Sequence, residues 1–318
     1  MKTQGPFWLA SPAKVTLHLR ILRRRSDGYH EIRIAQAPIA LYDRLRFRMG
    51  GAAGVSLHVT SPDPLGPTAD NLVRRAALAF QEAWAGLRAQ DGPTAQDRAE
   101  GAARAEGSVR AAIRLDKRIP VGAGLGGGSG NAAATLVALN RWHGHPLGPA
   151  RMEALAARLG ADVPFFLEPR PGWAEGIGER LSPLPGLPAL ELLVVKPALS
   201  IATGAAYAAA RAEADGAPRP AAEPDWRSVD AIAAGLFNAF EAALLPRHPE
   251  LPACKAALRD AGALGSLLSG SGSAVFGIFA DAPARDAAAA RLADSAARNG
   301  WRLLPCRTLP QHRYDFVF

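Results

Sequence analysis

A glycine-rich segment holds the residues best suited to chemistry in this sequence. Six of the nine positions from Gly122 to Gly130 are glycine, and an Ala-, Leu- and Val-rich run, Asn131 to Trp142, follows directly. Glycine lets bare backbone N–H groups approach an anion, and the amino end of a following helix adds a favourable dipole. The segment is therefore predicted to cradle a phosphate group.

Other motifs fit this segment less well. A Walker loop needs a lysine after its glycines, and none follows here. Gly122, Gly124 and Gly127 match a dinucleotide-binding G-x-G-x-x-G, but the preceding strand is charged and the next acidic residue is Glu153. The nucleophile elbow G-x-S-x-G fails at Asn131. A flexible surface loop is the simple alternative, although such loops rarely run straight into so apolar a helix.

Three segments, in order along the chain, resemble the GHMP kinase superfamily. Pro120–Ala133 is similar to its ATP loop, Ser11–Leu17 resembles its substrate-side motif P-A-K-x-N-L, and Leu268–Gly277 resembles its third, glycine-containing motif. The resemblance implies an ATP-dependent small-molecule kinase with an α+β, two-lobe fold. Its N-terminal lobe would resemble ribosomal protein S5 domain 2, and its C-terminal lobe would be ferredoxin-like.

Four shorter segments narrow the resemblance to one branch of the superfamily, which acts in the non-mevalonate isoprenoid pathway. They are Asp27–His30 (DGYH), Asp70–Leu72, Gly160–Phe166 and Ala174–Glu179. The resemblance implies transfer of the ATP γ-phosphoryl group to the tertiary 2-hydroxyl of a methylerythritol moiety. The expected partner is thus a small-molecule cytidine diphosphate substrate, and the expected cofactors are ATP and the Mg²⁺ that arrives with it.

The resemblance assigns catalysis to Asp162 and Lys14. Asp162 would accept the proton of the attacking hydroxyl, while Lys14 would keep that carboxylate ionised and stabilise charge at the reacting oxygens. From the residues alone, Asp162 could equally be a turn residue ahead of Pro164, and Lys14 an exposed charge on a strand.

The resemblance also implies an ATP site, in which Lys117 could instead be a surface residue. Its residues are Asn71, Lys117, Pro120, Gly122, Gly124, Leu125, Gly126, Gly127, Gly128, Ser129, Gly130 and Asn131. Magnesium is expected to be held by the phosphates, a hydroxyl and water, and no metal site formed by protein residues is expected.

For the cytidine substrate, the resemblance places Tyr29 against the cytosine and gives His30 a hydrogen bond to it. A flat aromatic face accepts any base, so the polar contact must select it. Tyr207 would close the other side, although it could be a half-buried tyrosine on a helix. The remaining predicted substrate residues are Thr16, Thr203, Gly270, Ser271 and Gly272.

Two positions depart from the family pattern. Thr16 stands where the family usually has Asn, and Gly130 stands where it usually has Ser. Thr16 keeps a hydroxyl that can hydrogen-bond, but Gly130 lacks a possible phosphate or magnesium contact, which Ser129 would have to supply.

Periodicity in the first half predicts the elements that must position these residues. Strands are expected over Val15–Ile21, Leu41–Met49, Val55–Val59 and Ala112–Ile119, with an antiparallel layer in the opening third. Helices are expected over Asn71–Leu87, Asn131–Trp142 and Ala150–Leu159. Arg88–Gly107 lacks apolar periodicity and is interpreted as an exposed linker.

The second half alternates strands and helices without a barrel-like repeat. Strands are expected over Leu190–Val195 and Ala274–Phe279, and helices over Ala233–Leu245, Pro252–Ala261 and Ala282–Arg298. We therefore predict two lobes, residues 1–168 and 169–318.

Composition limits the location and the partners. The 318 residues contain no long apolar run, signal-like amino terminus or CxxC pair, so a cytoplasmic protein without membrane contact, disulfide or zinc is expected. The net charge of +8 suits a polyphosphate ligand but also nucleic acid. The sequence leaves a monomer or a homodimer open.

Two other functions stay open at this point. Arg23, Arg24 and Arg25 could make a basic hairpin for RNA, but only Tyr29 supplies an aromatic ring there, so no nucleic-acid partner is expected. A kinase for mevalonate-type or amino-acid alcohols is the other alternative.

Overall fold

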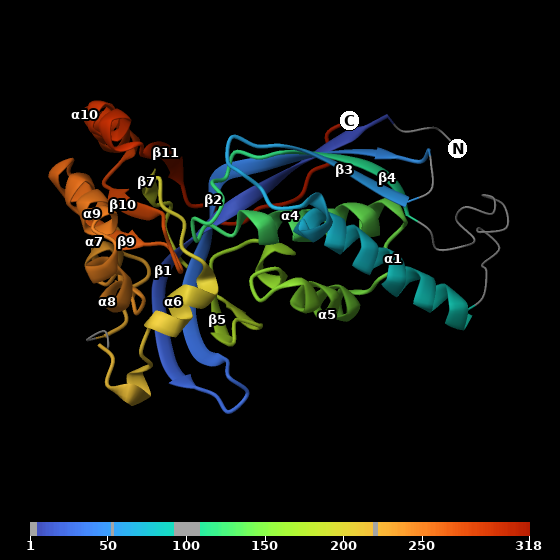
Figure 1. Ribbon diagram of the computed structural model, residues 1–318, viewed down its shortest axis with the longest axis horizontal. Helices are drawn as coiled ribbons and strands as arrows, with labels where there is room; N and C mark the ends of the chain where they lie inside the picture. The colour runs from blue at the N-terminus through green and yellow to red at the C-terminus, as the bar shows by residue number, and fades with distance from the viewer. Residues whose placement is uncertain (1–4, 52–53, 92–108, 219–221) are drawn as a thin grey trace.

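The protein has two lobes, each a β-sheet with helices packed on it (Figure 1). The computed structural model describes residues 5–51, 54–91, 109–218 and 222–318. The predicted α+β, two-lobe architecture is confirmed.

The first sheet has the strand order β3-β4-β2-β1-β8, and β5 and β6 extend it from β2. Its strands are β1 (Phe7–Arg24), β2 (His30–Met49), β3 (Gly54–Thr60), β4 (Arg110–Asp116), β5 (Gly172–Gly176), β6 (Arg180–Pro183) and β8 (Phe237–Asn238). β3 pairs with β4 in parallel, so the expectation of a wholly antiparallel layer was wrong for this strand.

Two helices, α1 (Leu72–Asp91) and α4 (Gly127–Trp142), pack on one face of this sheet, and α5 (Pro149–Leu159) packs on those two helices (Figure 1). The core between them is built from alternate residues of β1 and β2, among them Phe7, Leu45 and Phe47, all at most 1% exposed. Short 3₁₀ turns precede α1 at Thr68–Asp70 and follow α5 at Pro164–Phe166.

The second sheet is antiparallel, in the order β11-β7-β10-β9. Its strands are β7 (Glu191–Lys196), β9 (Gly265–Leu268), β10 (Val275–Phe279) and β11 (Arg302–Arg307). The helices of this half are α6 (Thr203–Ala209), α7 (Val229–Ala234), α8 (Glu241–Leu244), α9 (Glu250–Asp260) and α10 (Ala282–Asn299), with 3₁₀ turns at Glu213–Asp215 and Leu245–Arg247.

Two predicted elements need correction. The helix expected over Ala233–Leu245 is wrong, because the two-residue strand β8 divides that stretch into α7 and α8. The linker expected over Arg88–Gly107 begins too early, because α1 continues to Asp91. The rest of that segment, residues 92–107, lies outside the described part of the chain.

The lobes share the long hairpin of β1 and β2, which runs between them (Figure 1). The strand β8 pairs with β1 at His18 and Leu19, and β5 pairs with β2, although both follow residue 168 in the chain. The domain boundary after residue 168 stays a prediction.

Both cysteines of the chain lie in its interior. Cys254 and Cys306 are buried free thiols, and burial raises the pKa of each to about 12. Among the described residues, no helix has the length and apolarity needed to cross a membrane.

Candidate active site

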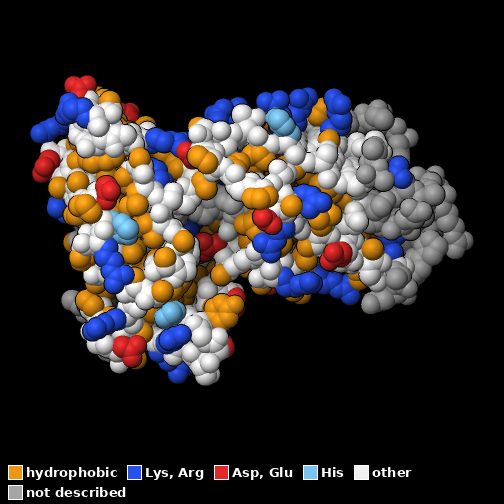
Figure 2. Space-filling view, viewed as in Figure 1, with side chains coloured by type: hydrophobic (Ala, Val, Ile, Leu, Met, Phe, Trp, Pro, Cys, Tyr) orange, Lys and Arg blue, Asp and Glu red, His pale blue; other side chains and the backbone are white. Residues whose placement is uncertain are grey.

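A pocket of about 850 Å³ lies between the lobes, where the surface is hollowed (Figure 2). It is lined by most of the predicted site residues: Lys14, Tyr29, His30, Asn71, Lys117, Pro120, Gly122, Gly124, Leu125, Gly126, Gly127, Gly128, Ser129, Asn131, Asp162, Thr203, Tyr207, Gly270 and Ser271. Thr16, Gly130 and Gly272 are not part of this lining. Segments far apart in the sequence therefore meet at one cavity.

The glycine loop ends in a helix amino terminus that faces the pocket. Gly122, Gly124 and Gly126 have left-handed φ values of 62°, 72° and 70°, which glycine adopts without strain. α4 begins at Gly127, four residues before the predicted start at Asn131, so Gly128 and Ser129 lie in its first turn. The first N–H groups of a helix lack partners within it, which makes this turn suited to an anion.

The loop is held by the third glycine-containing segment. Ala274 N donates to Ala123 O over 3.1 Å, and Ser269 Oγ donates to Gly124 O over 3.1 Å. A Cβ atom on Gly124 would lie 2.0 Å from Ser269 O, so no other residue fits at this crossing. The two segments thus reach their positions together.

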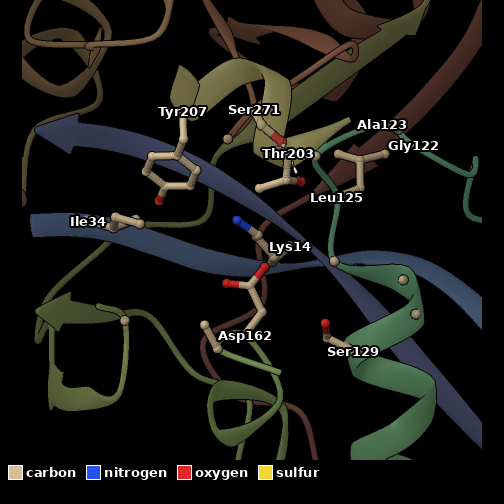
Figure 3. Close-up of a pocket in the computed structure, with 18 of the residues that line it drawn as sticks. Lys14, Ile34, Gly122, Ala123, Leu125, Ser129, Asp162, Thr203, Tyr207 and Ser271 are labelled. Atoms are coloured by element: carbon tan, nitrogen blue, oxygen red, sulfur yellow. Dashed lines mark hydrogen bonds between the residues drawn. The ribbon is translucent and has the colours of Figure 1, made fainter. Parts of the chain in front are cut away.

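Lys14 and Asp162 both extend into the pocket (Figure 3). Lys14 is 3% exposed, which excludes the alternative of an exposed strand charge. Its Nζ donates to Thr16 Oγ1 over 3.0 Å, and its backbone N donates to Leu125 O over 2.9 Å. Asp162 lies two residues after Gly160, which caps the end of α5, and a 3.0 Å hydrogen bond from Val163 N to Gly160 O closes the turn that carries Asp162.

The three predicted residues outside the lining, Thr16, Gly130 and Gly272, pack against neighbouring segments of the protein. Thr16 is fully buried and contacts the ammonium group of Lys14. A Cβ atom on Gly130 would lie 2.8 Å from Ser11 Oγ and 2.9 Å from Pro12 O, so position 130 faces β1. Gly272 packs against Leu268 in the same way. Direct contact of these three with a ligand stays a prediction.

The other end of the pocket is aromatic. His30 and Tyr207 stack with ring centroids 5.1 Å apart, and Phe240 meets Tyr207 edge-on at 4.9 Å. Tyr29 is 61% exposed at the rim. A cluster of planar rings of this kind suits a flat base.

Titration at this end follows from burial. Burial, with a smaller contribution from the charge of Asp162, raises the pKa of Tyr207 to about 12, so its hydroxyl keeps its proton. Burial, and then the nearby Arg24, lower the pKa of His30. At neutral pH His30 is therefore an uncharged imidazole that can hydrogen-bond to a neutral base.

The side chains of Asn238 and Thr203 anchor the third segment, Leu268–Gly277, at the pocket. Asn238 Nδ2 donates to Leu268 O and to Gly270 O, each over 2.8 Å. The hydroxyl groups of Thr203 and Ser271 lie 3.1 Å apart, and this hydrogen bond is drawn as a dashed line in Figure 3.

Within the described residues, no group of three or more His, Cys, Asp or Glu side chains could hold a metal ion.

Sequence reasoning missed two sets of residues. Leu65, Leu72, Leu115 and Val121 also line the pocket, and nothing in their spacing marks them. Asp43 carried a visible signal, because it falls on the apolar face of the predicted 41–49 strand, in line with Leu45 and Phe47.

Family models match both halves of the chain. The model for the GHMP kinases N terminal domain matches residues 71–168, and that for the GHMP kinases C terminal domain matches residues 220–298.

Two similar proteins share one name. A 4-diphosphocytidyl-2-C-methyl-D-erythritol kinase of Symbiobacterium thermophilum is 41% identical over 274 residues, which cover 85% of this chain and 89% of that protein. One of Pelotomaculum thermopropionicum is 42% identical, covering 88% and 91%.

Solved structures agree on the fold. A 4-(cytidine 5'-diphospho)-2C-methyl-D-erythritol kinase superposes with a TM-score of 0.73 at 35% identity, covering 95% of this chain and 99% of that one. A homoserine kinase of Cytophaga hutchinsonii, with a TM-score of 0.69, is 17% identical and shares the fold alone. This chain belongs to the 4-diphosphocytidyl-2-C-methyl-D-erythritol kinase family of the GHMP kinases.

Proposed function

We propose that this protein transfers the γ-phosphoryl group of ATP to the 2-hydroxyl of 4-diphosphocytidyl-2-C-methyl-D-erythritol, giving the 2-phosphate and ADP. The observation that carries the proposal is a single pocket with a helix amino end on one side, an aromatic end on the other, and Lys14 and Asp162 also in its lining. The names of the similar proteins support the same reaction.

The triphosphate binds along the glycine loop in this proposal. The exposed amides at the start of α4 and the ammonium group of Lys117 face its oxygens. The apolar side chains of Leu65, Leu72, Leu115 and Val121 accept the adenine, beside Asn71. Ser129 offers a hydroxyl that, with phosphate oxygens and water, would hold Mg²⁺, which neutralises phosphate charge when bound.

Phosphoryl transfer needs an alcohol that loses its proton as the phosphorus–oxygen bond forms. Asp162 accepts that proton, and the positive charge of Lys14, in the same pocket lining, stabilises the charge that develops at the reacting oxygens. Thr16 fixes the Lys14 ammonium through the 3.0 Å hydrogen bond, so the Asn-to-Thr departure preserves a polar partner for the lysine.

The cytidine end explains the choice of alcohol. Tyr29 covers one face of the cytosine, the neutral His30 hydrogen-bonds to its edge, and Tyr207 closes the other side. Mevalonate and homoserine have no flat ring to fill this end. We further propose a cytoplasmic monomer or homodimer that acts on small molecules rather than nucleic acid.

A coupled ADP-release assay with three alcohols tests the proposal. The cytidyl substrate should be phosphorylated. Mevalonate and homoserine at equal concentration should release ADP no faster than the background hydrolysis of ATP without added alcohol. Turnover of mevalonate or homoserine in preference to the cytidyl substrate would make this another GHMP kinase. No turnover together with salt-sensitive RNA binding would contradict the enzymatic function.

A further inference from the structure

Asp43 is a carboxylate in the interior of the N-terminal lobe. It lies on β2 opposite Ser11 of β1 and is 0% exposed. Its neighbours on the same face of β2 are Leu45 and Phe47, which are core residues. A lone carboxylate among such residues is costly, so its position calls for specific partners.

Four donors meet this carboxylate, and they divide between its two oxygens. Oδ1 accepts from Arg118 N over 2.6 Å and from Ile119 N over 2.9 Å. Oδ2 accepts from Asn131 Nδ2 over 2.8 Å and pairs with Lys117 Nζ. One oxygen therefore holds the backbone that enters the glycine loop, and the other holds two side chains from either end of it.

Those two side chains both line the nucleotide end of the pocket. The Lys117 side chain is 7% exposed, and its Nζ lies 3.4 Å from the point where a Cβ atom on Gly127 would be. The ammonium thus rests against the first turn of α4, beside the unpaired amides. Without a fixed acceptor, this flexible side chain would have to lose its rotamer freedom each time a phosphate bound.

We propose that Asp43 is a positioning residue of the nucleotide site, which holds Lys117 and Asn131 in place for the triphosphate of ATP. The carboxylate also balances the positive charge of Lys117 before ATP binds, while two N–H donors of the ammonium stay available to phosphate oxygens. The proposal rests on the proposed function for the identity of the nucleotide, but not on the alcohol substrate.

The substitution Asp43→Asn distinguishes the roles of the two carboxylate oxygens. The amide oxygen can still accept from Arg118 N and Ile119 N, whereas its NH₂ group would face Asn131 Nδ2 and Lys117 Nζ, donor against donor. Losing a charge-assisted bond should raise the calorimetric Kd for ATP, measured without any alcohol, about tenfold. The KM for the cytidyl substrate should stay within about twofold of the wild type.

A double-mutant cycle with Lys117→Met distinguishes positioning from general support of the fold. If Asp43 acts through Lys117, Asp43→Asn should weaken ATP binding much less in the Lys117→Met background. Glu191→Gln is the matched control, because Glu191 also pairs with a cation, Arg285, but outside the pocket; it should leave the Kd for ATP unchanged.

Two results would overturn the proposal. One is a double mutant whose Kd for ATP rises by the product of the two single-mutant factors, because the two residues would then act independently. The other is a Kd for ATP unchanged in Asp43→Asn while its unfolding temperature falls. Should Asp43→Asn fail to fold, Lys117→Met alone decides, because unchanged ATP binding in that variant contradicts the proposal. Since ATP binding is measured without alcohol, failure of the proposed phosphoryl transfer would be seen separately.

Discussion

At the scale of single residues, the site depends on glycines at positions where a Cβ atom would clash with a neighbouring segment. Gly124 crosses Ser269 so closely that a Cβ atom would lie 2.0 Å from its carbonyl oxygen, and its φ of +72° is unfavourable for other residues. Gly130 meets Ser11 and Pro12 in a similar way. The lack of a serine at position 130 therefore reflects packing against β1 and removes no side chain from the pocket lining.

Gly124→Ala should disrupt the contact between the glycine loop and the third segment. Overpacking and a strained φ together should cost at least about 2 kcal/mol, and the displaced loop should raise the KM for ATP strongly. Gly86→Ala is the control, because nothing lies within 4 Å of that site in α1 and alanine favours a helix. Equal unfolding temperatures and KM values for the two variants would contradict this account of the loop.

At the scale of elements, the hairpin of β1 and β2 serves both ends of the pocket. It carries Lys14 near the middle of β1, and Tyr29 and His30 at its far turn, where Asp27 Oδ1 accepts from Tyr29 N over 3.1 Å. α6 brings Tyr207 against His30 from the other lobe. The recognition of the base thus depends on the approach of α6 to the hairpin.

Tyr29→Ala should raise the KM for the cytidyl substrate by about 5- to 150-fold, since stacking of an aromatic ring on a base contributes about 1–3 kcal/mol. Tyr29→Phe keeps the ring and should stay within about twofold of the wild type. Steady-state kinetics with each substrate varied in turn provides the measurement. A parallel rise in the KM for ATP would show that Tyr29 supports the pocket as a whole and does not stack on the base.

How far the elements could be predicted depends on how local their causes are. The glycine loop and α4 are formed by consecutive residues, so the pattern of those residues alone predicted a phosphate-binding loop. Asp43 matters because strand pairing buries it beside Lys117, which lies 74 positions away. The strand β8 is two residues long and has no periodicity of its own; it exists because Phe237 and Asn238 pair with His18 and Leu19 of β1.

At the scale of the whole molecule, the lobes are joined close to the glycine loop. Arg302 of β11 donates from Nη1 to both oxygens of Asp63, over 2.9 and 3.0 Å, and from Nη2 to Arg118 O over 3.2 Å. Asp63 Oδ2 also accepts from Val121 N over 3.1 Å. One ion pair therefore ties the second sheet to the entry of the loop.

Arg302→Met should loosen this connection and cost about 1 kcal/mol, because both partners are partly exposed and water screens the pair. The unfolding temperature should fall by a few degrees, and the KM for ATP should rise modestly as the loop entry gains freedom. Arg307→Met, on the same strand but exposed, should leave both values unchanged. If Arg302→Met and Arg307→Met had the same unfolding temperature and the same KM for ATP, the Arg302 contact would have no role in joining the lobes.

The central claim is that ATP bound at the glycine loop phosphorylates an alcohol beside Asp162, which takes the proton. The most direct measurement is a single-turnover experiment with enzyme in excess over labelled ATP, comparing the wild type with Asp162→Asn. Loss of the proton acceptor should slow formation of the phosphorylated cytidyl product by about 10²–10⁴-fold, with the Kd for ATP unchanged. Product formation at the wild-type rate in Asp162→Asn would contradict the account.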